Sequence, residues 1–265
     1  MVPKTLAADE NQQPTIAIII DDMGNHWRQA ERLINLPYPM TLAFLPHRKH
    51  TPALARKAFR HNKEIMLHAP MENTLGLALG PGALTTSMTE DEIKESLRES
   101  LRSIPYVQGV NNHMGSLLTQ QPKQMNWVME ELFRYPLYFV DSRTIADSVA
   151  ARVSQSHQIP TLTRDIFLDH VQERDAVHAQ FQLLIQRARE KGFAIAIGHP
   201  HEVTVSYLEE ALRNLDEEGI SIATVSGLWS IASNGMPMFQ NADKRLVIEH
   251  LIARRDALNN VPLTP

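Results

Sequence analysis

The feature that most constrains this chain is the segment 15–24, in which an apolar run leads directly into two acidic residues. Five of its first six residues, Thr15-Ile-Ala-Ile-Ile-Ile20, are apolar. A run of this length predicts a buried strand and is too short to cross a membrane. Strands buried on both faces belong to parallel sheets or barrels, where ligands bind beyond the carboxyl ends of the strands. The segment therefore predicts a parallel α/β core with Asp21 and Asp22 at its functional edge.

The two carboxylates follow the strand with no residue between them. Adjacent carboxylates repel each other, so a positive group must balance them, and a divalent metal ion would do so. The alternative is that Asp21 or Asp22 caps the N-terminus of the next helix.

Composition narrows the functional classes. A chain of 265 residues suits one α/β barrel or two small domains, and 43% hydrophobic content predicts a sizeable core. With a net charge of −4 and no long basic run, we expect no nucleic-acid partner. Cysteine is absent, so a metal site must use carboxylates or some of the 12 histidines.

The two ends of the chain differ from its middle. Residues 1–14 have few apolar residues and predict a disordered segment or the remnant of a leader, so the protein is either cytoplasmic or lacks its leader in this sequence. We expect no transmembrane segment. Residues 231–265 predict a C-terminal extension, mostly helical, with the spacing of a packed helix at 242–258.

Strand and helix patterns alternate over residues 15–230. Strands are predicted at 15–20, 41–45, 64–68, 108–116, 137–140, 193–198 and 219–225, with one or two short ones in 160–169. Helices are predicted at 26–36, 52–61, 122–134, 145–157, 174–191 and 203–215. A further helix is predicted to begin after Thr89 and to carry Ile93, Leu97 and Leu101 on one face. This alternation implies parallel strands, and a closed or nearly closed (β/α) barrel of about seven strands fits better than an open doubly wound sheet. No glycine-rich phosphate-binding motif is present.

The segment 69–88 interrupts this alternation and predicts a long loop. Its leucines either cover a cleft or contact a partner, or they pack against the barrel. Those leucines are Leu75, Leu77, Leu79 and Leu84.

Ionisable side chains recur at the predicted carboxyl ends of strands, which meet at one mouth of a parallel barrel. They are Asp21, Asp22, His68, Glu72, His113, Asp141, His199 and His201. One such residue alone is more often a cap or a surface residue, but the joint pattern favours metal-assisted hydrolysis with a carboxylate base and a histidine acid. Ser116 and Ser142 lack the context of a nucleophile elbow, which disfavours a Ser-His-Asp triad.

Five segments carry a resemblance to a known family. They are Ile-Ile-Asp21-Asp22-Met-Gly24, Leu67-His68-Ala-Pro70-Met71-Glu72, Asn111-Asn112-His113-Met114-Gly115-Ser116, Phe139-Val140-Asp141-Ser142 and Ala196-Ile197-Gly198-His199-Pro200-His201. In their order and spacing the chain resembles the divergent polysaccharide deacetylases, related to the NodB-type carbohydrate esterases. The resemblance implies a distorted (β/α) barrel that removes N-acetyl groups from a polysaccharide or cell-wall glycan. It also implies a divalent metal ion, most simply Zn, and a periplasmic or secreted location.

The resemblance further implies roles for single residues. Asp21 corresponds to the catalytic base, Asp22 and His68 to metal ligands, and His199 to the catalytic acid. Mainstream members have a second histidine where this chain has Glu72, so we expect His113 as the third ligand and Glu72 as its competitor. The mainstream Arg-x-Pro-Tyr motif is absent, and residues 111–116 take its place. The predicted substrate-binding residues are Glu72, Asn112, Asp141, Ser142 and His201.

Two other functions stay open at this stage. The first is a catalytically weak or inactive protein on the same barrel, which binds glycan or a cell-envelope protein partner. The second is a phosphoesterase, but basic residues do not cluster near the motifs, and Arg143 is the only candidate for a phosphate contact.

Overall fold

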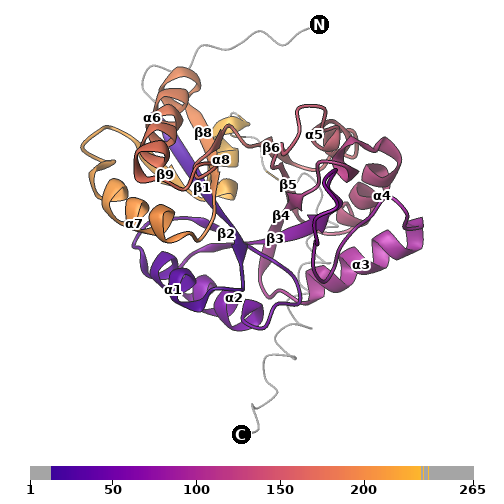
Figure 1. The fold of residues 1–265 in the computed structure, drawn as a ribbon. Helices are drawn as coiled ribbons and strands as arrows, with labels where there is room; N and C mark the ends of the chain where they lie inside the picture. Colours follow the sequence, from indigo (N-terminus) through magenta and orange to yellow (C-terminus); the bar gives the residue numbers. More distant parts are fainter. Residues whose placement is uncertain (1–12, 234, 236–237, 239–265) are drawn as a thin grey trace, which may run out of the picture.

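The structure is a computed structural model that describes residues 13–233, 235 and 238 of the chain. Strands and helices alternate along these residues (Figure 1). The strands are β1 (Thr15–Met23), β2 (Thr41–Phe44), β3 (Glu64–Met71), β4 (Val107–Met114), β5 (Tyr138–Asp141), β6 (Thr161–Thr163), β7 (Ile166–Phe167), β8 (Phe193–Gly198) and β9 (Ser221–Ala223). The α-helices are α1 (Trp27–Asn35), α2 (Thr51–Arg60), α3 (Glu90–Arg102), α4 (Pro122–Leu132), α5 (Ala150–Ser156), α6 (Arg174–Lys191), α7 (Glu202–Ala211) and α8 (Val225–Ala232).

In the described residues the strands form one curled sheet of nine strands. Eight lie in the order β6-β5-β4-β3-β2-β1-β8-β7, and β9 pairs with the first residues of β1. Every paired set of strands is parallel. This confirms the predicted α/β class and the distorted (β/α) barrel. Two strands of two or three residues, β6 and β7, lie in the segment 160–169 where one or two short strands were expected, and they raise the count above the predicted seven.

The two faces of the sheet have separate apolar clusters, because alternate residues of a strand point to opposite sides. The outer cluster packs under the surrounding helices and includes Ile16, Ile18 and Ile20 of β1. The inner cluster fills the barrel. Its buried members are Ala17, Ile19, Ala43, Met66, Tyr138, Val140, Ile195, Ile197, Val225 and Leu228. The last two belong to α8, so this helix packs against the inner face of the sheet beside β1 and β8 (Figure 1).

A buried carboxylate holds the start of α8. Glu64 of β3 accepts hydrogen bonds from the Thr41 hydroxyl at 2.7 Å and from the backbone N–H of Ser226 at 3.2 Å. An anion at a helix N-terminus is favoured by the helix dipole. Residues 1–12 of the predicted leader segment, and nearly all of the predicted extension including 242–258, lie outside the described residues.

Several boundaries differ from those predicted. β3 runs on to Met71, because β4 pairs with it up to Met114, so the loop begins later than expected. The helix expected at 145–157 begins only at Ala150. Among the described residues, no helix has the length and apolar character needed to cross a membrane.

Candidate active site

The period of two along each strand brings the polar site residues to the inside of the barrel. Asp21 lies two positions after the inner residue Ile19, and His199 lies two positions after the inner residue Ile197. His68 follows Met66 in the same way. These side chains therefore extend the inward-facing rows of β1, β3 and β8 toward the carboxyl ends of the strands. They come together beyond the apolar layer of the barrel, although their strands are far apart in sequence.

Asp22 reaches the same place by breaking this alternation. Two adjacent residues of a regular strand point to opposite faces. The pairing of β1 with β2 shifts in register between Ile20 and Met23, and Asp22 has a φ of +57°. A positive φ is unfavourable for a residue other than glycine, by roughly 1–2 kcal/mol. This local irregularity lets both carboxylates face the interior of the barrel.

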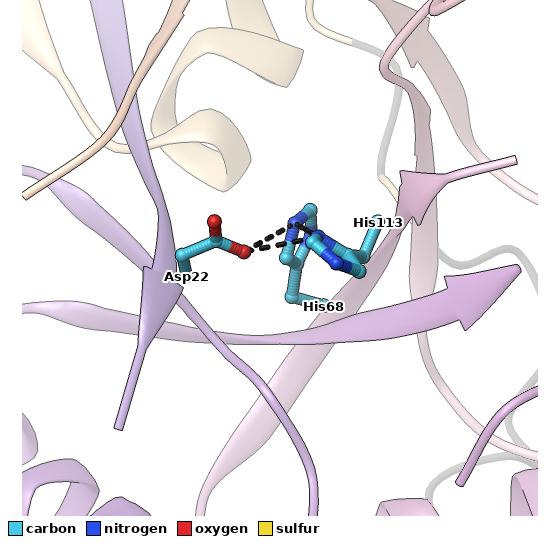
Figure 2. A group of neighbouring side chains, drawn as sticks. All are labelled: Asp22, His68 and His113. Carbon is cyan, nitrogen blue, oxygen red and sulfur yellow. Dashed lines mark hydrogen bonds and ion pairs between the residues drawn. The ribbon is translucent and has the colours of Figure 1, made fainter. Parts of the chain in front are cut away.

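Asp22, His68 and His113 form a compact group of three (Figure 2). The Asp22 Oδ1 atom lies 3.0 Å from His113 Nδ1 and 3.4 Å from His68 Nε2. The two imidazole nitrogens are 3.1 Å apart. The sequence prediction that these three residues share one small space is therefore matched by their geometry.

The three residues fit a divalent metal ion. Zinc bound at about 2.0–2.1 Å in a tetrahedral site places its ligand atoms about 3.3 Å apart, close to the three distances in this group. Asp22 Oδ1 is buried and makes no hydrogen bond of good geometry, although both imidazole nitrogens are near it. A buried carboxylate oxygen without a hydrogen bond needs a compensating charge. Two imidazoles and one carboxylate suit zinc and similar divalent ions.

Asn111 connects this group to Asp21, and the sequence analysis did not select it. Its Nδ2 donates to Asp21 Oδ1 at 2.8 Å, and its Oδ1 lies 2.7 Å from His68 Nδ1. The neighbouring Asn112, which was predicted to bind substrate, bonds instead to the backbone of Ser142 and Met114. The alternation of β4 explains this difference, because Asn111 shares the inner face with His113.

The electrostatics of the two carboxylates differ. Burial raises the pKa of Asp21, and the opposing effects of His68, His199 and the Asn111 hydrogen bond do not cancel this shift. Burial would also raise the pKa of Asp22, but the close contacts with His113 and His68 and the charges of these imidazoles outweigh it and lower that pKa. Asp22 is thus held ionised beside the imidazoles, whereas Asp21 is the more basic carboxylate, which suits proton abstraction.

His199 forms a pair with Asp169 on the other side of the site. Its Nδ1 lies 2.9 Å from Asp169 Oδ1, and its backbone N–H donates to Asp169 Oδ2 at 2.6 Å. Burial alone would lower the pKa of His199, but the bond to Asp169 and the charges of Asp21, Asp169 and Asp22 raise it to about 9. The sequence analysis missed Asp169, which its place after the short strand β7 could have indicated.

His201 lies close enough to this pair to form a second group of potential ligands. Both oxygens of Asp169 are, however, already used, since Oδ2 also accepts from the Thr204 hydroxyl at 2.8 Å. This second group therefore suits proton transfer through His199 better than it suits a metal ion.

The other predicted site residues lie near the mouth with varied surroundings. Glu72 accepts two hydrogen bonds of 2.6 Å from Thr86 and so holds the loop that contains Thr86 against the end of β3. Glu72 does not belong to the group of Asp22, His68 and His113. Asp141 accepts from the backbone N–H groups of Arg143 and Ala151 and from the Ser148 hydroxyl. The Ser142 hydroxyl is buried without a hydrogen-bond partner. Their roles in substrate binding stay predictions.

A polar cavity of about 260 Å³ opens beside Asp22 and His199, between the first turns of α1 and α7. Its lining consists of Asp22, Asn25, His26, Gln29, His199, Pro200, His201 and Glu202. No lysine or arginine lines it.

Fold and site together define a class: a distorted (β/α) barrel whose mouth carries an Asp/His group able to hold a metal ion, next to a second carboxylate and a carboxylate-paired histidine. Within that class, the chain belongs to the divergent polysaccharide deacetylase family, whose model matches residues 18–229. This confirms the resemblance found in the sequence motifs.

Two relatives share much of the sequence. The uncharacterized protein YibQ of Escherichia coli is 36% identical over 213 residues, which cover 80% of this chain and 66% of that protein. An uncharacterized protein of Haemophilus influenzae is 34% identical over 217 residues, which cover 82% of this chain and 77% of its own length. The chain thus matches just under two thirds of the E. coli relative.

Solved structures show the same fold. An uncharacterized protein of Agrobacterium tumefaciens superposes with a TM-score of 0.79 at 23% identity, covering 83% of this chain and 90% of that one. A mutant of a CE4 family pseudoenzyme of Bacillus anthracis, with restored enzymatic activity, gives a TM-score of 0.53 at 17% identity, covering 82% of this chain and 68% of that one. At these identities the likeness concerns the fold alone.

Proposed function

We propose that this protein is a metal-dependent hydrolase that removes N-acetyl groups from a polysaccharide or cell-wall glycan. The observation that carries the proposal is the group of Asp22, His68 and His113, whose facing ligand atoms lie within 3.4 Å of one another. Asp21 and His199, a base and an acid in the roles that the family implies, flank this group. Family membership supports the acetylated glycan as substrate.

Each residue of the site has a task in this proposal. Asp22, His68 and His113 would hold the metal ion, for which zinc is the first candidate. When bound, such an ion activates water and polarises the carbonyl of an amide. Asp21 accepts the proton of the attacking water, and the protonated His199 gives its proton to the leaving amine. Asp169 keeps His199 charged and oriented.

The cavity beside Asp22 and His199 supports a substrate without negative charge. Its lining offers amide, imidazole and carboxylate groups but no lysine or arginine that would hold a phosphate. Asn25, His26 and Gln29 make no side-chain hydrogen bonds with the described residues, so their polar atoms are free to bind hydroxyl groups of a sugar. A periplasmic or secreted location belongs to the same proposal, and cell fractionation tests it.

The decisive experiment measures acetate release from N-acetylated chitooligosaccharides and peptidoglycan fragments. We expect release by the zinc-loaded protein, loss on chelation, and recovery when zinc is returned. Tight binding of these glycans without release of acetate would instead favour an inactive glycan-binding protein. Turnover of generic phosphoesters but not of acetylated glycans would favour a phosphoesterase.

A further inference from the structure

The amide of Asn111 occupies a fully buried position between the proposed base and one proposed metal ligand. It comes from β4, where Asn111 pairs in register with His68 of β3, and it reaches Asp21 on β1. The two contacts use opposite ends of one amide: Nδ2 is 2.8 Å from Asp21 Oδ1, and Oδ1 is 2.7 Å from His68 Nδ1.

The chemistry of the partners fixes the orientation of this amide. An ionised carboxylate only accepts hydrogen bonds, so Asp21 must face the NH₂ group of Asn111. The amide oxygen then faces His68 and accepts the proton of Nδ1. His68 is thereby held with its proton on Nδ1 and a lone pair on Nε2. Nε2 is the atom that faces Asp22 and His113, at 3.4 and 3.1 Å.

Neither a carboxylate nor a cation could do both tasks. An aspartate at position 111 would accept from His68 but would repel Asp21. A lysine or arginine would bind Asp21 but offers no acceptor to His68. Asn112, the same residue type one position on, has its hydrogen bonds with backbone atoms only, so residue type alone does not produce this bridge.

We propose that Asn111 is a positioning residue with two simultaneous effects: it orients the carboxylate of Asp21 for proton transfer, and it holds His68 in the tautomer that presents Nε2 to a metal ion. The inference rests on the proposed function, because it assigns the base and the ligand as that proposal does. Outer partners of metal-ligating histidines commonly fix the tautomer in this way, and their loss weakens metal binding about 10–100-fold.

Two substitutions separate the two effects. Asn111→Asp keeps an acceptor for His68 and removes the donor to Asp21, so zinc affinity should stay within about 3-fold of wild type while kcat falls about 100-fold or more. Asn111→Leu removes both contacts at similar size, so zinc affinity should fall about 10–100-fold in addition to the loss of kcat. Zinc affinity is measured by competition with a chromophoric chelator. Asn112→Leu is the matched control, and it should lower thermal stability while leaving zinc affinity unchanged.

A spectroscopic readout tests the tautomer without metal or turnover. Long-range ¹H–¹⁵N spectra of the neutral His68 ring in the metal-free protein should show Nδ1 protonated in wild type and in Asn111→Asp, and a mixture of tautomers in Asn111→Leu. An Nε2-protonated ring in wild type, or equal zinc affinities of wild type and Asn111→Leu, overturns the role of Asn111. A wild-type protein that binds zinc but releases no acetate counts against the proposed hydrolysis, while the tautomer and affinity comparisons still decide the role of Asn111.

Discussion

The carboxylate of Asp169 makes two hydrogen bonds with His199, one with the imidazole Nδ1 at 2.9 Å and one with the backbone N–H at 2.6 Å. The first contact leaves Nε2 as the ring atom able to give a proton to a leaving group. The second fixes the backbone from which the ring projects. Asp169 is itself held by Thr204, so the pair is positioned by two elements, the segment after β7 and helix α7.

This pairing predicts a change in the pH profile of Asp169→Asn. Because the pKa of His199 is about 9, the wild-type acid stays protonated up to that pH and loses its proton above it. Removing the charge of Asp169 lowers this pKa toward the ordinary value of about 6.5, so the alkaline limb of kcat should move to lower pH by at least about one unit. Thr204→Val keeps the charge and should leave the limb near its original place. If the alkaline limbs of the kcat–pH profiles of wild type and Asp169→Asn coincide, Asp169 does not set the pKa of the catalytic acid.

A second prediction concerns the proposed base. Asp21→Asn keeps the size of the side chain and its contact with Asn111 but removes the basic oxygen. We expect kcat for acetate release to fall about 10²–10⁴-fold, with zinc affinity little changed, because Asp21 lies outside the group of three. Asp175→Asn, an exposed position in the first turn of α6, serves as the control. Full activity in Asp21→Asn would rule out Asp21 as the base.

A third prediction separates the two competing ligands. His113→Ala removes an imidazole that faces Asp22 at 3.0 Å, so zinc affinity should fall by more than about 100-fold, beyond the usual effect of losing an outer partner. Glu72→Gln should leave zinc affinity unchanged, because Glu72 binds Thr86. At 100 times its Kd, zinc should stabilise wild type by about 2.7 kcal/mol and His113→Ala by much less, as measured by thermal unfolding. The reverse order of the two variants would make Glu72 the ligand.

A fourth prediction concerns the cavity at the first turns of α1 and α7. Gln29→Ala removes an unpartnered amide from its lining, so KM for a chitooligosaccharide should rise about 5-fold, roughly the loss of one hydrogen bond, with kcat little changed. Gln182→Ala, the same change on the exposed face of α6, is the control. Equal KM values for both variants would place the sugar elsewhere.

The sequence could predict the fold and most of the site for one physical reason. Both depend on short-range regularities, namely the alternation of strands and helices and the position of polar residues at strand ends. Parallel strands end at one edge, so Asp22, His68 and His113 could be expected to meet although they are far apart in the chain. The inner-face period of two would also have selected Asn111 over Asn112, had it been counted back from His113.

Other features required the tertiary structure. The strand pattern gives no sign that β1 shifts its register at Asp22, yet only this shift turns both carboxylates inward. The pairing of Asp169 with His199 depends on β7 lying beside β8, a contact between a two-residue strand and a strand that follows a long helix. The packing of α8 into the barrel depends on Glu64, which is distant in sequence.

The sequence by itself therefore determined which chemical groups the protein has and at which end of the sheet they gather, because hydrophobic periodicity fixes strands and faces locally. The tertiary structure alone decided which atoms face each other. Hydrogen bonds such as those of Asn111 tolerate changes of only a few tenths of an ångström in the donor–acceptor distance. That precision comes from packing between strands that are not neighbours in the sequence.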